Sequence, residues 1–306
     1  MFQRLVLYFQ GMFPPLHAMA VILYAYAFIL GLHQLQDTDF TFQSFYVRGA
    51  ISLLFLVLLI RVMDEFKDYE DDLINFPDRP LPSAQVKKSD LKFLGGLCFV
   101  LPLILNVPNA KMFGGVVICL LYSLFMLKWF FFEEKMRKSL PLALITHHPI
   151  AYLYLIYMGI CFLEAQGLEH SPETWSLFWI ILPVGLPSTN WEFSRKLRAP
   201  QEEDTYTTYS KIWGSRNACM VALSTQILCL IGFTVYYQKI DKPVWFLGGF
   251  IAVFIFLMLP YILFAVNNKH NHPMKVYAER QSLFLQVALI GSYFISTSMD
   301  SPAEID

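Results

Sequence analysis

Long apolar stretches alternate with short polar stretches along this chain of 306 residues. A membrane-spanning helix needs about 20 largely apolar residues, and nine stretches reach or approach that length. They are residues 13–34, 44–63, 91–107, 112–132, 141–163, 174–191, 216–237, 243–266 and 281–299. Because these stretches are continuous and lack the alternation of strands, they predict nine transmembrane α-helices and not a β-barrel.

The composition agrees with this interpretation. Hydrophobic residues make up 56% of the chain and charged residues 15%, and the mean hydropathy is +0.47, outside the usual balance of soluble proteins. We therefore predict an all-α, multi-pass integral membrane protein. The net charge of −1 gives no reason to expect a nucleic-acid partner. The five cysteines lie in or beside apolar stretches without CxxC spacing, which predicts buried free thiols.

The distribution of Lys and Arg predicts an orientation. Placing the N-terminus in the cytoplasm leaves five segments on that side, with nineteen of the 23 Lys and Arg residues between them. The five segments are residues 1–12, 61–92, 128–138, 192–216 and 267–280. The positive-inside rule therefore favours nine spans with a cytoplasmic N-terminus. Chemistry that involves the polar segments is then expected on the cytoplasmic side.

The most acidic of these segments follows the second predicted span, at residues 61–82. Asp64, Asp68 and Asp72 recur every four residues, so on a continuing helix their carboxylates share one face. Carboxylates that converge repel one another unless a cation lies between them. Mg²⁺ is a hard cation that takes such oxygen ligands together with substrate phosphates. The alternative interpretation is a solvated charged cap on a membrane helix.

Residues 64–83 resemble the first aspartate-rich motif of the UbiA superfamily of intramembrane prenyltransferases, NDxxDxxxD followed by a short spacer and RPLPSG. The chain reads DEFKDYEDD at 64–72 and RPLPS at 79–83, with Asp64 in place of Asn and Glu65 in place of the first Asp. The resemblance implies that Asp64, Glu65, Asp68 and Asp72 bind Mg²⁺. Arg79 is then a candidate for contact with a diphosphate.

The family's second motif, DxxDxxGD after the sixth span, is only partly matched at residues 190–214. Glu192 keeps an acidic group in register, while Arg195 and an alanine stand in place of the next two aspartates. Arg and Lys can neutralise a diphosphate as a metal ion does. We therefore expect Arg195, Lys196 and Arg198 to bind diphosphate in place of one metal ion, with Glu192 as a remaining metal ligand. For Lys196 and Arg198, ordinary positive-inside anchoring is the alternative.

Three further residues are candidates. Lys128 follows a Tyr-Ser pair at the end of the fourth span, where the family often has a basic residue near the diphosphate. His147 and His148 lie in the fifth predicted span, where ionisable groups are expensive unless they face a cavity. The two histidines either line an acceptor pocket, shuttle a proton or form a satisfied polar kink.

The resemblance implies a single domain over residues 1–306, in which nine helices surround a central cavity open to the cytoplasm. It implies Mg²⁺-dependent transfer of a prenyl group from an isoprenoid diphosphate to a hydrophobic acceptor in the membrane. Asp64, Asp68, Asp72 and Glu192 are the expected catalytic residues. Two alternatives stay open: a membrane terpene synthase that needs no acceptor, and a non-catalytic lipid-binding or transport protein on the same fold.

Overall fold

The computed structural model of the chain describes residues 1–267 and 273–300, with side chains described as far as Ile295. Within these residues all regular secondary structure is helical, which confirms the all-α prediction. The chain forms two compact units. Unit 1 comprises Met1–Tyr26 and Phe42–Glu169, and unit 2 comprises Ala27–Thr41 and His170–Asp306. The single domain predicted over residues 1–306 stays a prediction.

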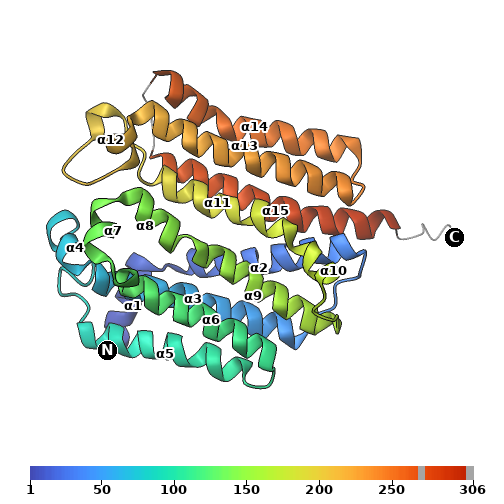
Figure 1. Cartoon of the computed structure of the whole chain (residues 1–306), viewed down its shortest axis with the longest axis horizontal. Coiled ribbons are helices and arrows are strands. Elements are labelled where there is room, and N and C mark those ends of the chain that lie inside the picture. Colours follow the sequence, from blue (N-terminus) through green and yellow to red (C-terminus); the bar gives the residue numbers. More distant parts are fainter. Residues whose placement is uncertain (268–272, 301–306) are drawn as a thin grey trace. The chain divides into compact units, whose positions relative to one another are not determined.

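Helix α2 (Pro15–Gln36) contributes its first part to unit 1 and its second part to unit 2 (Figure 1). The other helices of unit 1 are α1 (Phe2–Met12), α3 (Ser44–Lys67), α4 (Tyr69–Asn75), α5 (Lys88–Asn106), α6 (Ala110–Leu127), the 3₁₀ helix η1 (Trp129–Phe131), α7 (Glu133–Lys138), α8 (Leu140–His147) and α9 (Pro149–Gln166). The other helices of unit 2 are α10 (Pro172–Trp175), η2 (Ser176–Ile180), α11 (Ile181–Ser194), η3 (Pro200–Glu202), α12 (Tyr209–Trp213), α13 (Ser215–Lys239), α14 (Val244–Asn267) and α15 (Met274–Asp300).

Seven helices in the described part of the chain are long and apolar enough to cross a membrane. They correspond to seven of the predicted spans, with α8 and α9 together forming one of them. The predicted span 174–191 instead combines α10, η2 and the 14-residue α11. The span predicted at 281–299 lies in α15, a 27-residue helix. A total of nine transmembrane helices and a cavity open to the cytoplasm therefore stay predictions.

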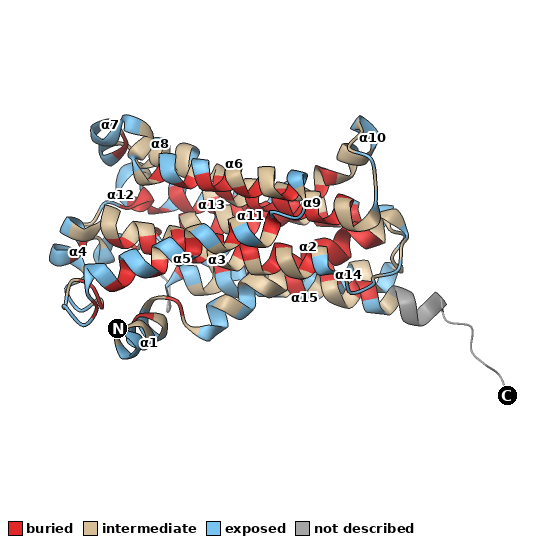
Figure 2. Cartoon of the chain, turned by 90° about the horizontal axis from the view of Figure 1, so that it is seen from below, coloured by how far each residue is buried: buried red, intermediate tan, exposed pale blue. Residues whose placement is uncertain are grey.

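Helix α3 is the centre of unit 1 and packs against α5, α6 and α9. Figure 2 shows buried positions, in red, along its length. The crossing with α9 is close at Gly49, where an added Cβ would lie 2.8 Å from the sulfur of Cys161. Small residues permit such close crossings in membrane bundles. Polar side chains join the helices as well, because Asn106 of α5 donates to the Ser52 hydroxyl at 2.8 Å and accepts from the Tyr157 hydroxyl at 3.1 Å.

Unit 2 is built on α11, α13, α14 and α15, which pack against one another. Helices α13 and α14 run side by side in Figure 1. The contact of α11 with α13 is tight, because a Cβ at Gly232 would lie 2.6 Å from Cβ of Pro183. The second part of α2 is held by Gln34, whose side-chain oxygen accepts from the hydroxyls of Tyr236 at 2.8 Å and Ser292 at 2.9 Å.

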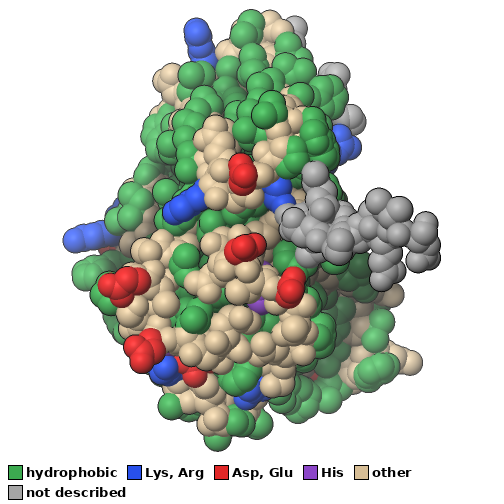
Figure 3. Space-filling view, turned by 90° about the vertical axis from the view of Figure 1, so that its right-hand side faces the viewer, with side chains coloured by type: hydrophobic (Ala, Val, Ile, Leu, Met, Phe, Trp, Pro, Cys, Tyr) green, Lys and Arg blue, Asp and Glu red, His purple; other side chains and the backbone are tan. Residues whose placement is uncertain are grey.

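The outer surfaces of the helices carry many exposed apolar side chains. Ile104, Ile118, Ile231 and Phe256 are between 54% and 67% exposed. Figure 3 views the ends of the helices and shows hydrophobic side chains around the sides, with Asp and Glu toward the middle. Exposed apolar surface of this extent is unusual in a soluble protein and is what lipid-facing helices require. Together with the seven apolar helices, this surface identifies a multi-pass integral membrane protein.

Candidate active site

The acidic motif begins on α3 and continues past its end. Helix α3 ends at Lys67, and Asp68 has the non-helical angles φ −101° and ψ 9°. The short helix α4 then carries Asp72. The three aspartates are therefore not on one continuous helix, although the amide of Asp68 donates to the Asp64 carbonyl and that of Asp72 to the Asp68 carbonyl. The chain turns at Asp68, the middle residue of the repeat.

Three of the four predicted carboxylates in this motif are paired with a cation. Asp64 lies 3.3 Å from the ammonium of Lys67, and both oxygens of Asp72 accept from the Arg79 guanidinium at 2.6 Å. Glu65 pairs with Arg61, one helical turn before it. Glu65 is 1% exposed, and its second oxygen has no hydrogen-bond partner. Opposite charges therefore compensate most of the motif from within unit 1.

Asp68 is different. Within the described residues, its carboxylate has no ion pair or hydrogen bond. Burial, together with the negative charges of Asp64, Asp72 and Asp71 and against an opposing effect of Lys67, raises the pKa of Asp68 to about 6. A carboxylate surrounded by other carboxylates binds a cation readily, because the cation relieves the repulsion. Asp68 is thus the position in unit 1 best prepared for a positive charge.

Aromatic and basic side chains from later in unit 1 lie beside this motif. The Trp129 ring contacts two cations, the Lys67 ammonium at 4.6 Å and the Arg137 guanidinium at 5.1 Å from its centroid. Arg137 also donates to Asp71 at 2.6 Å. The sequence did not predict these contacts. The sequence signals in residues 128–138 were the basic content, which indicated orientation, and Lys128 as a candidate diphosphate ligand, and neither pointed to the contacts of Trp129 or Arg137.

The turn that carries Trp129 has an uncommon backbone. Trp129, Phe130 and Phe131 have φ of 50°, 48° and 65°, a left-handed conformation that residues with a Cβ rarely adopt. This turn places Trp129 and Phe130 edge to face with the His147 ring, at 5.4 and 5.5 Å between centroids. Nδ1 of His147 lies 2.9 Å from the Ala143 carbonyl. Since a carbonyl only accepts, Nδ1 carries the proton, and the buried Nε2 has no partner.

The other predicted basic ligand of unit 1 is Lys128, an exposed residue that caps α6. The neighbouring Tyr122 hydroxyl donates to the Thr146 carbonyl at 2.7 Å, which ties α6 to α8. His148 begins the break between α8 and α9 and contacts the Tyr152 ring at 5.9 Å. Neither histidine forms a metal group with its neighbours in the described residues.

In unit 2, the structure brings Glu192, Arg195 and Lys196 together at the end of α11. The Glu192 carboxylate accepts from the Arg195 guanidinium at 2.5 and 2.8 Å, and the Lys196 ammonium lies 3.5 Å from it. Glu192, the one acidic group in register with the second motif, is therefore paired with two cations that directly follow α11. An anion that approaches Arg195 and Lys196 competes with Glu192 for them.

Tyr209 of α12 is a candidate that the sequence did not predict. Its ring lies 5.9 Å from the Lys196 ammonium and stacks on Trp213 at 5.2 Å. Its hydroxyl is buried and has no hydrogen-bond partner among the residues that the structure describes. Burial together with the Glu192 charge raises the pKa of Tyr209. The hydroxyl therefore keeps its proton at neutral pH. The sequence signal was only its place in the Thr/Tyr-containing run after the second motif.

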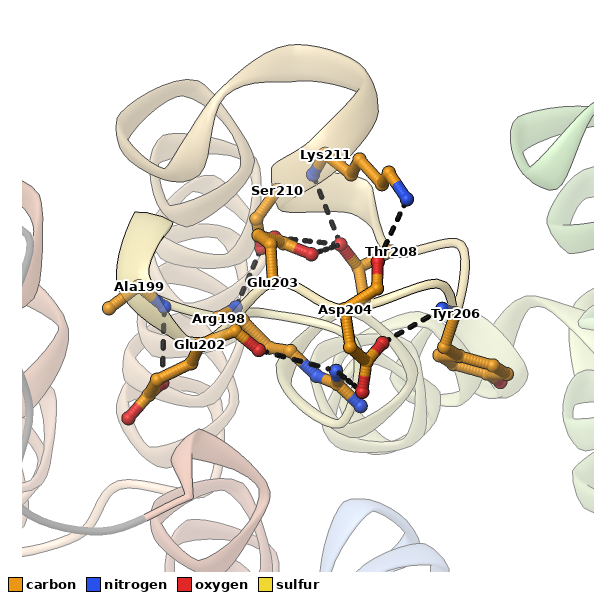
Figure 4. A network of polar contacts seen from close by, with 9 residues as sticks. All are labelled: Arg198, Ala199, Glu202, Glu203, Asp204, Tyr206, Thr208, Ser210 and Lys211. Carbon is orange, nitrogen blue, oxygen red and sulfur yellow. Dashed lines mark hydrogen bonds and ion pairs between the residues drawn. The ribbon is translucent and has the colours of Figure 1, made fainter. Parts of the chain in front are cut away.

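The loop from Arg198 to Lys211 is closed by its own polar contacts (Figure 4). Arg198 pairs with Asp204 at 2.7 Å, and its amide donates to the Ser210 hydroxyl at 2.6 Å. Thr208 donates to the Glu203 carboxylate at 2.7 and 2.8 Å. The three acidic residues out of register with the motif, Glu202 to Asp204, are therefore used inside the loop. Arg198 has a structural role here in addition to its predicted role.

The donor chemistry of unit 1 fits a magnesium ion, since all its candidate ligands are carboxylate oxygens. No group of three or more His, Cys, Asp or Glu side chains stands ready around one point in residues 1–267 and 273–300. Glu65 and Asp72 are already paired with arginines. Asp64 and Asp68 remain the pair whose charge is least compensated.

Comparisons with known proteins agree with this arrangement. No family model matches the chain. The chain is 21% identical over 254 residues to a digeranylgeranylglyceryl phosphate synthase of Methanobrevibacter smithii, covering 82% of this chain and 88% of the relative. It is 23% identical over 232 residues to the enzyme of the same name from Methanosphaera stadtmanae, covering 74% and 79%.

Two solved structures share the fold. A UbiA homolog from Aeropyrum pernix K1, in its apo form, has a TM-score of 0.68 at 12% identity, with 90% of this chain and 98% of that chain covered. A structure described as giving insights into digeranylgeranylglyceryl phosphate synthase in membranes has a TM-score of 0.56 at 18% identity, with 96% and 98% covered. Fold and polar motifs thus define an all-helical membrane protein of the UbiA type. The sequence relatives and the shared fold support the resemblance to the UbiA superfamily that residues 64–83 predict.

Proposed function

We propose that this chain is a Mg²⁺-dependent prenyltransferase that moves a prenyl group from an isoprenoid diphosphate to a hydrophobic acceptor within the membrane. The observation that carries the proposal is Asp68, a carboxylate without a protein counter-ion among other carboxylates. It lies in the motif that resembles the family's first metal-binding motif. The sequence relatives are, by their names, synthases that form a glyceryl phosphate with two geranylgeranyl groups. We infer that the acceptor here is an alcohol of comparable, lipid-like chemistry.

Asp64 and Asp68 are the residues we assign to hold Mg²⁺, with Glu65, Asp72 and Glu192 as further candidate ligands. When bound, the ion neutralises charge that develops on the leaving diphosphate. The chain's own cations do the rest of the neutralisation. Arg195 and Lys196 exchange Glu192 for diphosphate oxygens, and guanidinium groups suit these forked contacts. Arg79, Lys128 and Arg198 are further candidates for diphosphate contacts.

The reaction breaks the bond between the prenyl carbon and the diphosphate oxygen, and the electron pair leaves with the diphosphate. The acceptor oxygen then bonds to the prenyl carbon and gives up its proton. Fixed charges that stabilise the departing diphosphate accelerate this step, because they are already oriented when the charge appears. The positive-inside distribution of Lys and Arg supports a cytoplasmic location for these residues.

The test uses purified protein in nanodiscs with Mg²⁺, prenyl diphosphates of several chain lengths and a prenylated glyceryl phosphate as acceptor. We expect diphosphate release together with a prenylated product detected by mass spectrometry. Asp68→Asn should reduce turnover at least about 100-fold. The matched control is Asp78→Asn, because Asp78 is an exposed acidic residue of the same segment.

Each other outcome has a definite meaning. Release of diphosphate with a cyclised or hydroxylated prenyl product, and no use of acceptor, would identify a terpene synthase. Binding of prenyl diphosphate without release would identify a lipid-binding or transport protein. Equal turnover by wild type and Asp68→Asn would show that Asp68 does not have the metal-binding role we assign to the acidic motif.

A further inference from the structure

Three amide side chains meet in the interior of unit 2. Asn190 comes from α11, Gln226 from α13 and Gln281 from α15. Their exposed fractions are 2%, 1% and 2%. Polar side chains on membrane helices are costly when buried and normally have a specific partner or a function. These three residues were not among the sequence-predicted site residues.

The three amides form a closed ring of hydrogen bonds. Asn190 donates to the side-chain oxygen of Gln281 at 3.0 Å, Gln281 donates to that of Gln226 at 3.3 Å, and Gln226 donates to that of Asn190 at 3.2 Å. Each amide therefore gives one hydrogen bond and accepts one within the ring. Such a ring forms only at one rotation and one height of the three helices. It specifies their register in a way that apolar packing does not.

The ring adjoins a second set of contacts that fixes the last turn of α11. The hydroxyls of Ser194 and Tyr261 lie 2.7 Å apart, and Tyr261 donates to the Met274 carbonyl at the start of α15 at 3.3 Å. Both hydroxyl residues are buried, at 1% and 0% exposed. The Trp191 indole also donates to Glu279 of α15 at 3.1 Å. Helices α13, α14 and α15 thus hold this turn from several sides.

The same turn carries the charged residues of the proposed diphosphate site. Glu192 is two residues after Asn190, and Arg195 directly follows Ser194 at the helix end. A rotation of α11 by one residue would turn Glu192 by about 100° around the helix axis. The direction in which Glu192, Arg195 and Lys196 point is therefore set by how α11 is rotated.

We propose that the ring of Asn190, Gln226 and Gln281 is a positioning device that fixes the rotation of α11 and so orients Glu192, Arg195 and Lys196 toward the diphosphate of the prenyl donor. The inference rests on the proposed function, since it assigns the three amides to the site where the donor binds. The three are positioning residues, because they act through α11 and do not touch the substrate.

The test separates positioning from stability. A single substitution leaves one buried donor and one buried acceptor of the remaining two amides without their ring partner and destabilises the fold. Replacing all three amides by apolar groups of similar shape is close to neutral. The informative variant is therefore the triple replacement Asn190→Leu, Gln226→Met and Gln281→Met. We expect it to fold with a similar unfolding temperature and to show a KM for geranylgeranyl diphosphate raised about 10-fold or more. The KM for the acceptor should change little.

Gln34→Met is the matched control. Gln34 is an amide of the same unit that accepts hydrogen bonds from Tyr236 and Ser292 but has no contact with the ring. This control should reduce stability and leave the KM for the donor unchanged. Hydrogen–deuterium exchange at residues 189–196 gives a readout that does not depend on activity. Exchange there should increase in the triple variant and not in the control.

The outcomes of the two proposals can be told apart. If the wild-type protein transfers prenyl groups and the triple variant has an unchanged KM for the donor, the ring is not a positioning device. The proposed function is unaffected by that result. A wild-type protein that neither releases diphosphate nor binds the donor overturns the proposed function. In that case hydrogen–deuterium exchange tests whether the ring fixes α11. Unchanged exchange at residues 189–196 in the triple variant would show that it does not.

Discussion

Carboxylates only a few residues apart in the acidic motif have different surroundings. The spacing of Asp64, Asp68 and Asp72 predicts a shared face, and the turn at Asp68 breaks the helix that this prediction assumes. The counter-ion of Asp71 could not be predicted, because Arg137 lies 66 residues away and pairs with Asp71 only after folding. What the sequence does predict is the motif itself, since its residue types and spacing are local. The predicted roles of its residues stay predictions.

Asp68 gives a prediction for stability against pH. Its pKa is raised from 3.8 to about 6 in the folded protein, so folding favours its protonated form. The associated stability is present below pH 4 and is lost as the pH rises through about 6. In metal-free protein, Asp68→Asn should therefore raise the unfolding free energy at pH 7.5, by at most about 3 kcal/mol. The gain should vanish near pH 4.

Thermal unfolding in EDTA, followed by intrinsic fluorescence at several pH values, measures this effect. Asp78→Asn is again the control and should shift the curve little at any pH. A lower unfolding temperature for Asp68→Asn at pH 7.5 would contradict the prediction. The same variant should lose turnover, so that stability and activity change in opposite directions, as is common at functional sites.

Tyr209 gives a second prediction at the residue scale. Its buried hydroxyl lacks a protein partner, and an unsatisfied buried donor costs about 1–3 kcal/mol. Tyr209→Phe keeps the stacking with Trp213 and should not lower the unfolding temperature. Because the hydroxyl is available beside Lys196 and Glu192, we expect the variant to bind prenyl diphosphate several-fold more weakly. Titration of donor binding checks this, with Tyr206→Phe, at a half-buried tyrosine of the same segment, as the control. Equal affinities of wild type and Tyr209→Phe would exclude a role for the Tyr209 hydroxyl.

Single elements show where apolar patterns are informative and where they are not. The predicted span 44–63 matches α3, because no proline interrupts it. The span predicted at 174–191 is divided into α10, η2 and α11, in a stretch that contains Pro172, Pro183 and Pro187. The predicted span 141–163 divides at His148, directly before Pro149. Proline lacks the amide that would continue a helix, and hydropathy alone does not register this loss.

Helix α1 was not predicted as an element, since its 11 residues are too few to span a membrane. It is attached to α5 by a two-fold contact, in which the Arg4 guanidinium donates to Asp90 at 2.5 and 3.0 Å. The Asp90 side chain is only 4% exposed. Arg4→Ala leaves this carboxylate without its charged partner and should lower the stability of unit 1.

Chemical or thermal unfolding of Arg4→Ala measures this loss, and limited proteolysis should cleave the N-terminal segment sooner. Arg48→Ala is the matched control, because Arg48 has only an exposed contact with the Ser44 carbonyl at 3.3 Å. Equal stability of the two variants would show that α1 is not held by the Arg4 contact.

For the whole molecule, the all-helical fold was predictable from the sequence. The relatives share only 12–23% of residues with this chain, and no family model matches it. The prediction succeeded because the apolar pattern defines the helices and residues 64–83 retain the motif. The second motif fails to match, and there the structure shows Glu192 paired with Arg195 and Lys196.

The orientation in the membrane is the last prediction, and it can be tested on the intact protein. The positive-inside rule places residues 61–92 in the cytoplasm, and nine spans place residues 163–174 outside. All five native cysteines are buried, so a membrane-impermeant maleimide should react mainly with an introduced thiol.

Gln85→Cys and Glu173→Cys provide exposed positions in the two segments. In right-side-out vesicles only Glu173→Cys should be labelled, and in inside-out vesicles only Gln85→Cys. Three predicted spans separate the two positions, so they should lie on opposite sides of the membrane. Labelling of both from the same side would mean that an even number of spans separates them. The segment formed by α8 and α9 would then not cross the membrane as predicted.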